Sequence, residues 1–569
     1  MLNIKLGPIA KTDQKNLAKI IHFEHSAGQD NYIFKGAVDS TNHMNKYLPQ
    51  QAQKTKSRMT AKHNIVWFKR DLRINDHAPL LNASRQAAPI IPLYIVEPDY
   101  WEQPDASRRH WHFIHDCLFD LNISLRELGQ QLIIKVGDAC EVIKNLHLEH
   151  NIDRLYTHEE TGNLWSYHRD KAVQNLCDNI NIAEHMSPSN GVIRKLHSRD
   201  GWSKIRTARM AENIHPKPHG LQSVPLCKSD PLPDKTDPMF GNLPIANVQK
   251  GGRSQALTDL RSFLIHRSHG YLSNISAPHL SEFHCSRLST HLTWGSLSVR
   301  EVAQSILKRR SQLSPSENKR FGRNLRAFES RLAWRCHFIQ KIEDQPKIET
   351  HCMHPSFEGL RVDEHNNLHF QAWASGHTGY PFVDACMRNL TAEGWITFRM
   401  RAMLVSFASY QLWLDWRVTG HHLACMFTDY EPGIHYSQLQ MQSGVTGINA
   451  IRIYNPIKQS KEHDPTGSFI RKWVPELRDV SDEFIHEPWR FKKTLISNSN
   501  FMIGRDYPAP IVDQTSSARI AKQKIFEIRN GQAFQRDANT VFLKLGSRKT
   551  VSKSKKKTKP PNDDQLSLF

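Results

Sequence analysis

The sequence predicts an α/β domain with a doubly wound parallel sheet, followed by an all-α domain. Short apolar strand patterns alternate with helical patterns over residues 62–190. Such alternation indicates a parallel sheet with helices on both faces. Prolines then gather between residues 215 and 252, and from there to about residue 530 only helical periodicity is found. A chain of 569 residues is also too long for one core, so two folded domains are expected.

Changes of pattern divide the chain into five segments. In order, they are an N-terminal extension (1–58), the α/β domain (62–190), an interdomain linker (191–255), the helical domain (256–530) and a basic flexible tail (531–569). The extension is polar and lacks clear periodicity, and a strand pattern begins soon after Met59. We therefore expect either that Met59 is the biological start or that the extension is disordered. The prolines of the linker indicate a segment that wraps over the surface.

Four buried strands are expected in the α/β domain, each a short apolar run. They are Ile65–Phe68, Ile90–Val96, Gln131–Val136 and Arg154–Thr157. Helical patterns lie between them at about residues 78–87, 107–128 and 138–150. The charged run Lys69–Arg73, together with Asp76, follows the first strand. Charge clusters are usually solvated, so a structural group of salt bridges is the simplest interpretation of this run.

Two helices dominate the helical domain. The first opens at the turn Thr378–Pro381, where proline suits the first helical position and Asp384 the first turn. Its apolar face consists of Phe382, Val383, Cys386, Met387 and Leu390.

The second helix is expected from about Ile396 to Val418. It is apolar nearly all round between Ala402 and Trp416, which is typical of a helix buried in a large protein. A membrane span is the alternative, but charged residues leave an apolar run shorter than the ~20 residues that a span needs. A buried Arg401 requires a carboxylate partner, and Asp429 is the candidate.

The composition narrows the class of partner. The chain carries 76 basic and 56 acidic residues, a formal net charge of +20, which favours a polyanion and above all nucleic acid. The 9 cysteines form no C-x-x-C pair, so no disulfide framework, zinc site or Fe–S site is expected. No secretory segment or membrane span is visible, so a cytoplasmic monomer without membrane contact is expected.

Three long motifs follow one another in the helical domain. They are TGYPFVDACMR from Thr378, GW-x-x-x-R-x-R from Gly394 and RIYNP-x-x-Q-x-x-x-x-DP-x-G-x-FIRKWVPEL from Arg452. In this order they resemble the DNA photolyase and cryptochrome flavoprotein family, as a divergent bacterial member. The resemblance implies that the helical domain binds FAD.

The resemblance also implies which residues hold the FAD. They are Tyr271, Cys285, Ser286, Arg287, Leu288, Ser289, Arg335, Arg401, Asp429, Glu431 and His435. Hydroxyls and N–H groups just ahead of a helix can hold a pyrophosphate, although a plain helix cap would also explain this loop. The family's leading Thr in the loop is Cys285 here, which removes one hydroxyl donor.

Catalytic and DNA-binding positions are implied in the same way. The catalytic residues would be Trp334, Arg399, His435 and Trp416, and the DNA-binding residues Arg331, Trp334, Arg335, Phe398 and Arg399. Arg331 stands where the family usually has Glu. Thr397 and Phe398 stand in place of the family's His and Asn, which leaves open the lesion, a cyclobutane dimer or a (6-4) product, and its strand context.

The resemblance places His435 at the position that faces flavin N5. There a neutral imidazole could form a hydrogen bond to a reduced flavin, or it could titrate. Alternatively, His435 is a core histidine whose hydrogen bonds are satisfied within the protein. The family's electron-feeding tryptophan chain is incomplete. Trp416 matches its middle member, whereas Leu439 and Asp363 replace the inner and outer ones. Substitutes for these two are sought among Tyr410, Trp413, Tyr436 and Trp395.

The segment from Tyr156 to Asp170 resembles the region beside the family's antenna pocket. The residues leave open whether an antenna chromophore binds there, and whether it is a folate, a deazaflavin or a flavin.

The last five residues read QLSLF, namely Gln565, Leu566, Ser567, Leu568 and Phe569. They match the pentapeptide by which bacterial repair and replication proteins bind the sliding clamp, although a short motif can also arise by chance. The lysine-rich run before them suits phosphate contacts that do not read sequence.

The predicted function is light-driven repair of UV-induced pyrimidine dimers in DNA, by electron transfer from photoexcited reduced FAD. The alternatives are a cryptochrome that senses blue light without repair, and a related protein that only binds DNA.

Overall fold

The computed structural model describes residues 62–224, 227–364, 366–490 and 501–546. The predicted N-terminal extension and the clamp-binding-like pentapeptide lie outside these residues. None of the helices in the described part of the chain is long and apolar enough to span a bilayer.

The first part of the chain forms a parallel sheet with the strand order β3-β2-β1-β4-β5. The strands are β1 (His63–Phe68), β2 (Ile90–Val96), β3 (Ile133–Val136), β4 (Ile152–His158) and β5 (Ala183–Ser187). The first four confirm the predicted strands to within a few residues. The sequence analysis missed β5 because this edge strand has a mostly polar sequence and no fully buried residue, so it carries no apolar pattern.

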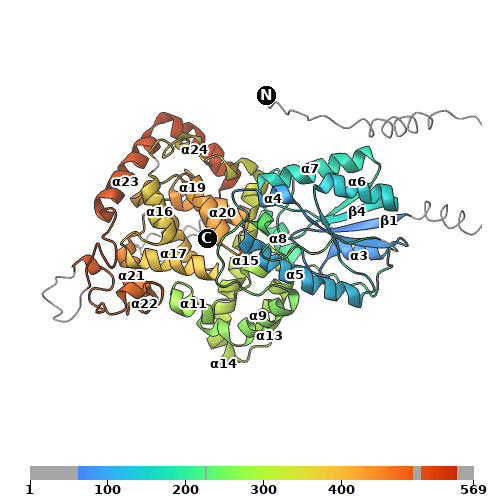
Figure 1. The fold of residues 1–569 in the computed structure, drawn as a ribbon, viewed down its shortest axis with the longest axis horizontal. Helices are drawn as coiled ribbons and strands as arrows, with labels where there is room; N and C mark the ends of the chain where they lie inside the picture. Colours follow the sequence, from blue (N-terminus) through green and yellow to red (C-terminus); the bar gives the residue numbers. More distant parts are fainter. Residues whose placement is uncertain (1–61, 225–226, 365, 491–500, 547–569) are drawn as a thin grey trace, which may run out of the picture. The chain divides into compact units, whose positions relative to one another are not determined.

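Helices cover both faces of this sheet, as predicted (Figure 1). They are α3 (Ala78–Ser84), α4 (Pro98–Trp101), α5 (Arg108–Glu127), α6 (Ala139–His150) and α7 (Leu164–Asn179). The alternation along β1 sorts its side chains into two cores. Val66 and Phe68 pack in the core that contains α5, whereas Ile65 and Trp67 pack in the core that contains α6 and α7.

After β5 the regular elements of the described chain are helices. The α-helices are α8 (Trp202–Ala211), α9 (Arg253–Ile265), α10 (Tyr271–Asn274), α11 (Pro278–His284), α12 (Ser289–Thr293), α13 (Val299–Ser311), α14 (Pro315–Glu317), α15 (Arg323–Asp344), α16 (Asn367–Ser375), α17 (Pro381–Glu393), α18 (Phe398–Ser406), α19 (Trp416–Met426), α20 (Pro432–Ser443), α21 (Pro456–His463), α22 (Ser468–Trp473), α23 (Gln514–Asn530) and α24 (Gln532–Leu545). A long loop with one short 3-10 turn separates α8 from α9. The predicted linker therefore contains a helix, α8, whose Trp202 and Met210 are buried among the helices.

The helix α17 begins at Pro381, as predicted, and its predicted apolar face is buried. Asp384 in its first turn accepts hydrogen bonds from the backbone N–H and the hydroxyl of Thr378, at 2.8 and 2.6 Å. The hydroxyl of Tyr507 donates to the same carboxylate. This first-turn carboxylate therefore holds the preceding turn as well as the helix.

The single helix expected over Ile396–Val418 was wrong. α18 ends at Ser406 and passes into the π-helical turn η6 (Phe407–Gln411), after which Trp413 has a φ of 55°. α19 then starts anew, with the Asp415 side chain accepting the backbone N–H of Arg417 at 2.8 Å. A segment that is apolar all round has no face whose periodicity could reveal the break, and the N-cap carboxylate supplies the new start.

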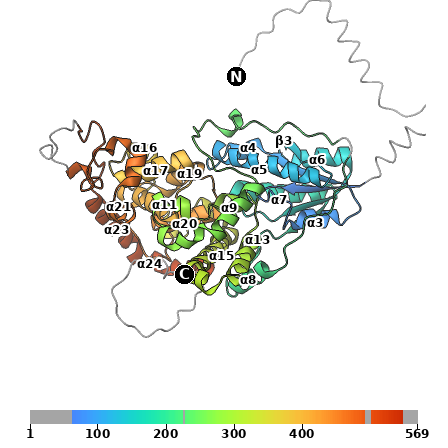
Figure 2. The ribbon, with the colours of Figure 1, turned by 90° about the horizontal axis from the view of Figure 1, so that it is seen from below.

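The flexible tail expected from residue 531 was also wrong for its first part. Residues 532–545 form α24, which buries Phe534, Val541 and Leu545 in the core of the helical part. α24 follows α23 at the edge of the helical part (Figure 2). A helix of amphipathic sequence is stabilised by packing its apolar face, and this face was overlooked beside the lysine-rich run that follows.

The charged run after β1 is buried rather than solvated. Asp71 accepts hydrogen bonds from His77 Nε2 at 2.9 Å and from His158 Nδ1 at 2.6 Å. His77 Nδ1 in turn accepts the backbone N–H of Leu80, so the proton of His77 lies on Nε2. These three side chains could also surround a metal ion, but their hydrogen bonds already account for the arrangement.

We predict that His158 makes the protein sensitive to acid. Burial lowers the pKa of His158 to about 3. Between pH 6.5 and about 3 the unfolded chain therefore binds a proton that the folded chain does not, and stability falls with pH by up to about 1.4 kcal/mol per unit. Chemical denaturation at pH 7, 6 and 5 measures the free energy of unfolding. This free energy should fall less steeply with pH in His158→Gln than in the wild type. The matched control is His219→Gln at an exposed position, and equal slopes in the two variants contradict the prediction.

Candidate functional site

A cavity of about 670 Å³ lies within the helical part. Its walls come from α10, the loop before α12, α15, α18, the loop between α19 and α20, α20 itself and the end of α24. Most of the lining is apolar, with polar groups at intervals, and the volume lies in the range of small-molecule and cofactor sites.

The cavity brings together most of the site residues that the sequence predicts. They are Tyr271, Cys285, Ser286, Arg287, Ser289, Arg331, Trp334, Arg335, Phe398, Arg399, Arg401, Asp429, Glu431 and His435. Two predicted residues lie elsewhere: the side chains of Leu288 and Trp416 are buried in the core and do not line the cavity. Gln565–Phe569 are outside the described residues.

Arg401 and Asp429 form the ion pair that the sequence predicts. The guanidinium contacts the two carboxylate oxygens at 2.9 and 3.0 Å, in a bidentate arrangement. It also lies over the ring of Phe427, 4.1 Å from its centroid. The pair therefore ties α18 to the loop before α20.

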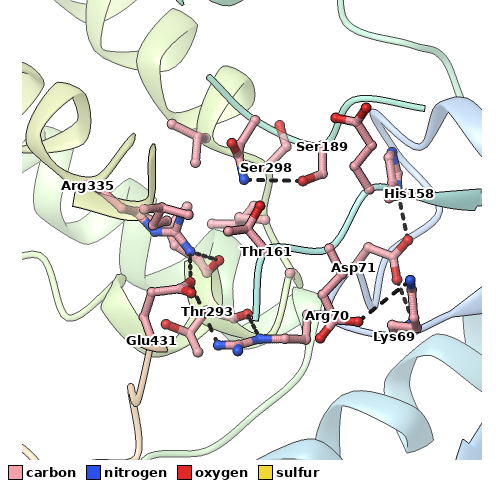
Figure 3. Close-up of a pocket in the computed structure, with 18 of the residues that line it drawn as sticks. Lys69, Arg70, Asp71, His158, Thr161, Ser189, Thr293, Ser298, Arg335 and Glu431 are labelled. Carbon is pink, nitrogen blue, oxygen red and sulfur yellow. Dashed lines mark hydrogen bonds and ion pairs between the residues drawn. The ribbon is translucent and has the colours of Figure 1, made fainter. Parts of the chain in front are cut away.

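Glu431 forms a second pair on the same loop. Arg335 of α15 donates to it at 2.5 Å, and Arg70 of the loop after β1 approaches it at 3.7 Å. Arg70 also donates to the carbonyl of Tyr430 at 2.9 Å. Figure 3 shows these side chains around a small cavity of about 60 Å³ between the sheet and the helices. The sheet is thus connected directly to the wall of the large cavity.

The close approach of the α/β part to the helical part depends on one glycine, Gly295. Gly295 has a φ of 75°, and a Cβ there would lie 2.2 Å from the carbonyl oxygen of Arg70. Arg73 donates to the carbonyl of Gly295 at 3.0 Å. Any side chain at this position would push the sheet away from the helices.

α15 presents one continuous face to the cavity. The guanidinium of Arg331 lies 3.8 Å from the ring centroid of Trp334, so a cation covers one face of the indole. About one and two turns beyond Trp334, Phe338 and Lys341 line the cavity as well. Arg331, which replaces the Glu expected from the resemblance, therefore covers one face of the Trp334 indole.

His435 is held as a neutral imidazole. Burial lowers its pKa to about 4, and its Nε2 lies 3.0 Å from the carbonyl of Gly420. The proton is therefore on Nε2, and Nδ1 is left as an acceptor. Of the interpretations that the sequence left open, titration near neutral pH is disfavoured.

The loop from Cys285 to Ser289 precedes a helix of only five residues, so the helix dipole contributes little there. The Ser286 hydroxyl accepts the backbone N–H of Leu288 at 3.3 Å, and Arg267 donates to the carbonyl of Ser286 at 3.2 Å. Burial raises the pKa of the Cys285 thiol to about 12, so the thiol stays protonated.

Trp416 belongs to a buried aromatic group behind the cavity. Its ring centroid lies 6.5 Å from that of Tyr436, and its Nε1 donates to Cys352 Sγ at 3.4 Å. The hydroxyls of Tyr436 and Tyr430 both donate to Asp105, which stands before α5. Of the two residues that interrupt the tryptophan chain, Leu439 lines the cavity and Asp363 is exposed.

The predicted site residues did not include Thr397, Gln438 or Lys341, although these three polar residues line the cavity. Thr397 Oγ1 and Gln438 Nε2 are buried without a hydrogen-bond partner among the described residues. Spacing could have indicated two of the three, since Gln438 follows His435 by three positions and Lys341 follows Trp334 by seven.

The antenna-like segment is held by ion pairs, within itself and with Glu97 after β2. Arg169 bonds Glu97 and Glu160 at 2.5 and 2.7 Å, and it lies over the ring of Trp67. Burial raises the pKa of Glu97 to about 7. Tyr156 stacks on His185 at 4.9 Å.

The fold and this site define a class of protein: a parallel α/β part joined to a helical part that encloses a ligand cavity. Residues 64–201 match the family model for DNA photolyase, and residues 328–527 match that for the FAD binding domain of DNA photolyase. The chain belongs to the DNA photolyase and cryptochrome family.

Relatives in this family carry both kinds of name. Deoxyribodipyrimidine photo-lyase of Salmonella typhimurium is 30% identical over 495 residues, covering 82% of this chain and 98% of the relative. Cryptochrome-1 of Aedes aegypti is 24% identical, covering 82% and 93%. A class III photolyase structure from Agrobacterium tumefaciens superposes with a TM-score of 0.71 at 25% identity, covering 83% of this chain and 98% of that one.

We predict that Arg401→Met destabilises the fold markedly. Removing the guanidinium leaves the Asp429 carboxylate buried without its partner, which costs about 3 kcal/mol or more. Urea denaturation measures the loss, and a double-mutant cycle with Asp429→Asn isolates the coupling between the two side chains. Additive single and double losses would show that the pair does not act as a unit.

Proposed function

We propose that this protein binds FAD in the large cavity and uses light to repair UV-induced pyrimidine dimers in DNA, by electron transfer from the photoexcited reduced flavin. The observation that supports this most is the gathering, around one cavity of about 670 Å³, of 14 residues that the resemblance implies. They come from segments as distant as Tyr271 and His435.

The residues of the cavity fit a flavin. Gln438 Nε2 and Thr397 Oγ1 are buried polar atoms without partners among the described residues, and a ligand rich in carbonyl and N–H groups would satisfy them. His435 Nδ1 is an acceptor, which suits the N5–H of a reduced flavin better than the bare N5 of an oxidised one. When bound, a reduced flavin supplies the light-excited electron. The protein orients the flavin and excludes water from the cavity.

The side chains around the cavity would hold the damaged strand. Trp334 offers an aromatic surface for a base. Arg399 has a hydrogen bond to Ser276 Oγ at 3.1 Å but no carboxylate partner among the described residues, so its charge is available for a phosphate. Flipping a dimer out of the helix costs a few kcal/mol, least where damage already weakens stacking. Phosphate contacts by a strongly basic chain offset this cost.

Electrons would reach the flavin through the aromatic group behind the cavity. The ring centroids of Trp416 and Tyr436 are 6.5 Å apart. The ring centroid of Tyr430, in the cavity wall, lies 6.4 Å from that of Tyr436. We propose this group as the replacement for the missing inner and outer tryptophans. The proposed place for an antenna chromophore is the segment from Tyr156 to Asp170, with its chemistry left open.

A cryptochrome function is the second candidate. It is favoured by Arg331, whose guanidinium covers one face of the Trp334 indole and so reduces the aromatic surface left for a flipped base. In that case the protein would bind FAD and respond to light without acting on damaged DNA.

Illumination of the flavin-loaded, reduced protein with a dimer-containing oligonucleotide separates these functions. We expect the intact bases to be restored under blue light and not in the dark, as measured by chromatography of the oligonucleotide. Trp334→Ala should lower the yield by at least tenfold because the stacking surface is lost. Flavin uptake without restoration or DNA binding would favour the cryptochrome, and tight binding without restoration would favour a protein that only binds DNA.

The last residues of the chain suggest a partner. We propose that Gln565–Phe569 bind the bacterial sliding clamp, with Gln565 hydrogen-bonded in a small pocket and the apolar side chains in a neighbouring one. Deleting these five residues should abolish binding to a purified clamp in surface plasmon resonance, with repair of free oligonucleotide unchanged. A deletion that binds the clamp as tightly as the full chain excludes this partner.

A further inference from the structure

One side of the cavity carries a buried amine without a counter-charge. Lys341 stands on the cavity face of α15, seven residues and so about two turns beyond Trp334. It is only 5% exposed. Within the described part of the chain its ammonium has no hydrogen bond or ion pair, and it lies 5.4 Å from the ring centroid of Phe338.

The charged groups around Lys341 offer it no carboxylate. Arg199, from the segment before α8, is paired with Asp344 at 3.0 Å and donates to His337 Nδ1 at 2.8 Å. His337 therefore carries its own proton on Nε2, and it lines the cavity beside Lys341. On the facing helix α24, Lys544 interacts electrostatically with Asp344. Lys544 is itself a cation, so it offers Lys341 no counter-charge.

This arrangement costs stability. Burial, with the positive charge of Arg199 adding to it, lowers the pKa of Lys341 to about 7. An apolar side chain of similar length would fill the same place without desolvating an amine. A buried, unpaired cation that faces a cavity is therefore more readily explained by a ligand than by the fold.

We infer that Lys341, with the Nε2–H of His337, binds a phosphate group of a ligand that enters the cavity. The inference rests on the proposed function, which supplies two sources of phosphate: the pyrophosphate of FAD and the backbone of a DNA strand. Above pH 7 binding transfers up to one proton from solvent to the Lys341 amine, whereas below pH 7 the amine is already mostly protonated; in both cases the ammonium pairs with the phosphate oxygens. No other bond forms or breaks.

Protonation of Lys341 makes the affinity for phosphate depend on pH. Because the phosphate pairs with the ammonium, affinity should be greatest below pH 7. Above pH 7 it should fall by up to tenfold per unit until the pKa of Lys341 in the complex is reached. Titrations at pH 6.5 and 8.5 distinguish the two sources: one arm adds FAD to the apoprotein, and the other adds a dimer-containing oligonucleotide to the flavin-loaded protein. Calorimetry in buffers of different ionisation enthalpy counts the proton.

Three variants sharpen the test. Lys341→Met should weaken binding in one arm by about 10- to 100-fold, abolish the pH dependence and, if DNA is the source, reduce the salt slope by about one. Lys341→Arg should keep the affinity and lose the pH dependence, because guanidinium stays charged. The control is Lys308→Met, which removes the same charge from an exposed position on α13 outside the cavity and should leave both arms unchanged.

Stability distinguishes a ligand contact from a structural role. Because the folded pKa of Lys341 is lowered, the unfolded chain binds more protons between about pH 7 and 10.5, and wild-type stability rises with pH across this window. Lys341→Met should flatten that rise and melt at a higher temperature than the wild type at pH 7. A variant that binds less tightly while being more stable cannot be explained by misfolding.

The inference is overturned if Lys341→Met binds both FAD and the oligonucleotide within twofold of the wild type, or if wild-type binding in both arms is the same at pH 6.5 and 8.5. Failure of the proposed function is a separate result. A chain that takes up no FAD, but whose apoprotein binds the oligonucleotide through Lys341, would refute the flavin and support the phosphate site.

Discussion

Two arginine–carboxylate pairs fix the wall of the cavity, and the arrangement of the rest depends on them. Asp429 and Glu431 stand on the short loop between α19 and α20. Asp429 holds Arg401 of α18, whereas Glu431 holds Arg335 of α15 and is approached by Arg70 from the sheet. A buried charge that loses its partner is strongly destabilising, so these segments cannot shift independently. The loop therefore gives the cavity one shape, which a cofactor site requires.

The features that the sequence predicts well are those that one local signal decides. An uninterrupted apolar run sets β2, and a proline at the first helical position sets the start of α17 at Pro381. The pairing of Arg401 with Asp429 follows from a different kind of reasoning, since a buried cation needs an anion and few carboxylates stand nearby along the chain. Most of the candidate site followed from the resemblance, because its motifs are long and ordered.

The features that were missed depend on contacts between distant segments. The break after Gln411 lies in a stretch that is apolar all round, so no periodic face could reveal it. α24 is stable because Phe534 packs against His354, 180 positions earlier, with ring centroids 4.1 Å apart. Trp416 lies outside the cavity because α19 starts anew after the break. A sequence pattern predicts apolar faces and helix caps. It does not predict which distant surface an apolar face packs against.

Basic residues of the cavity fall into two groups that composition alone cannot separate. Arg335 and Arg401 are paired with carboxylates, so they build the wall and add little field inside it. Arg331, Arg399 and Lys341 have no carboxylate partner in the described part of the chain, and all three line the cavity. A cation that is partly buried acts more strongly on an anion than an exposed one, because less solvent screens it. The cavity thus carries positive charge that no carboxylate offsets away from the two pairs, and the pairs themselves keep its wall rigid.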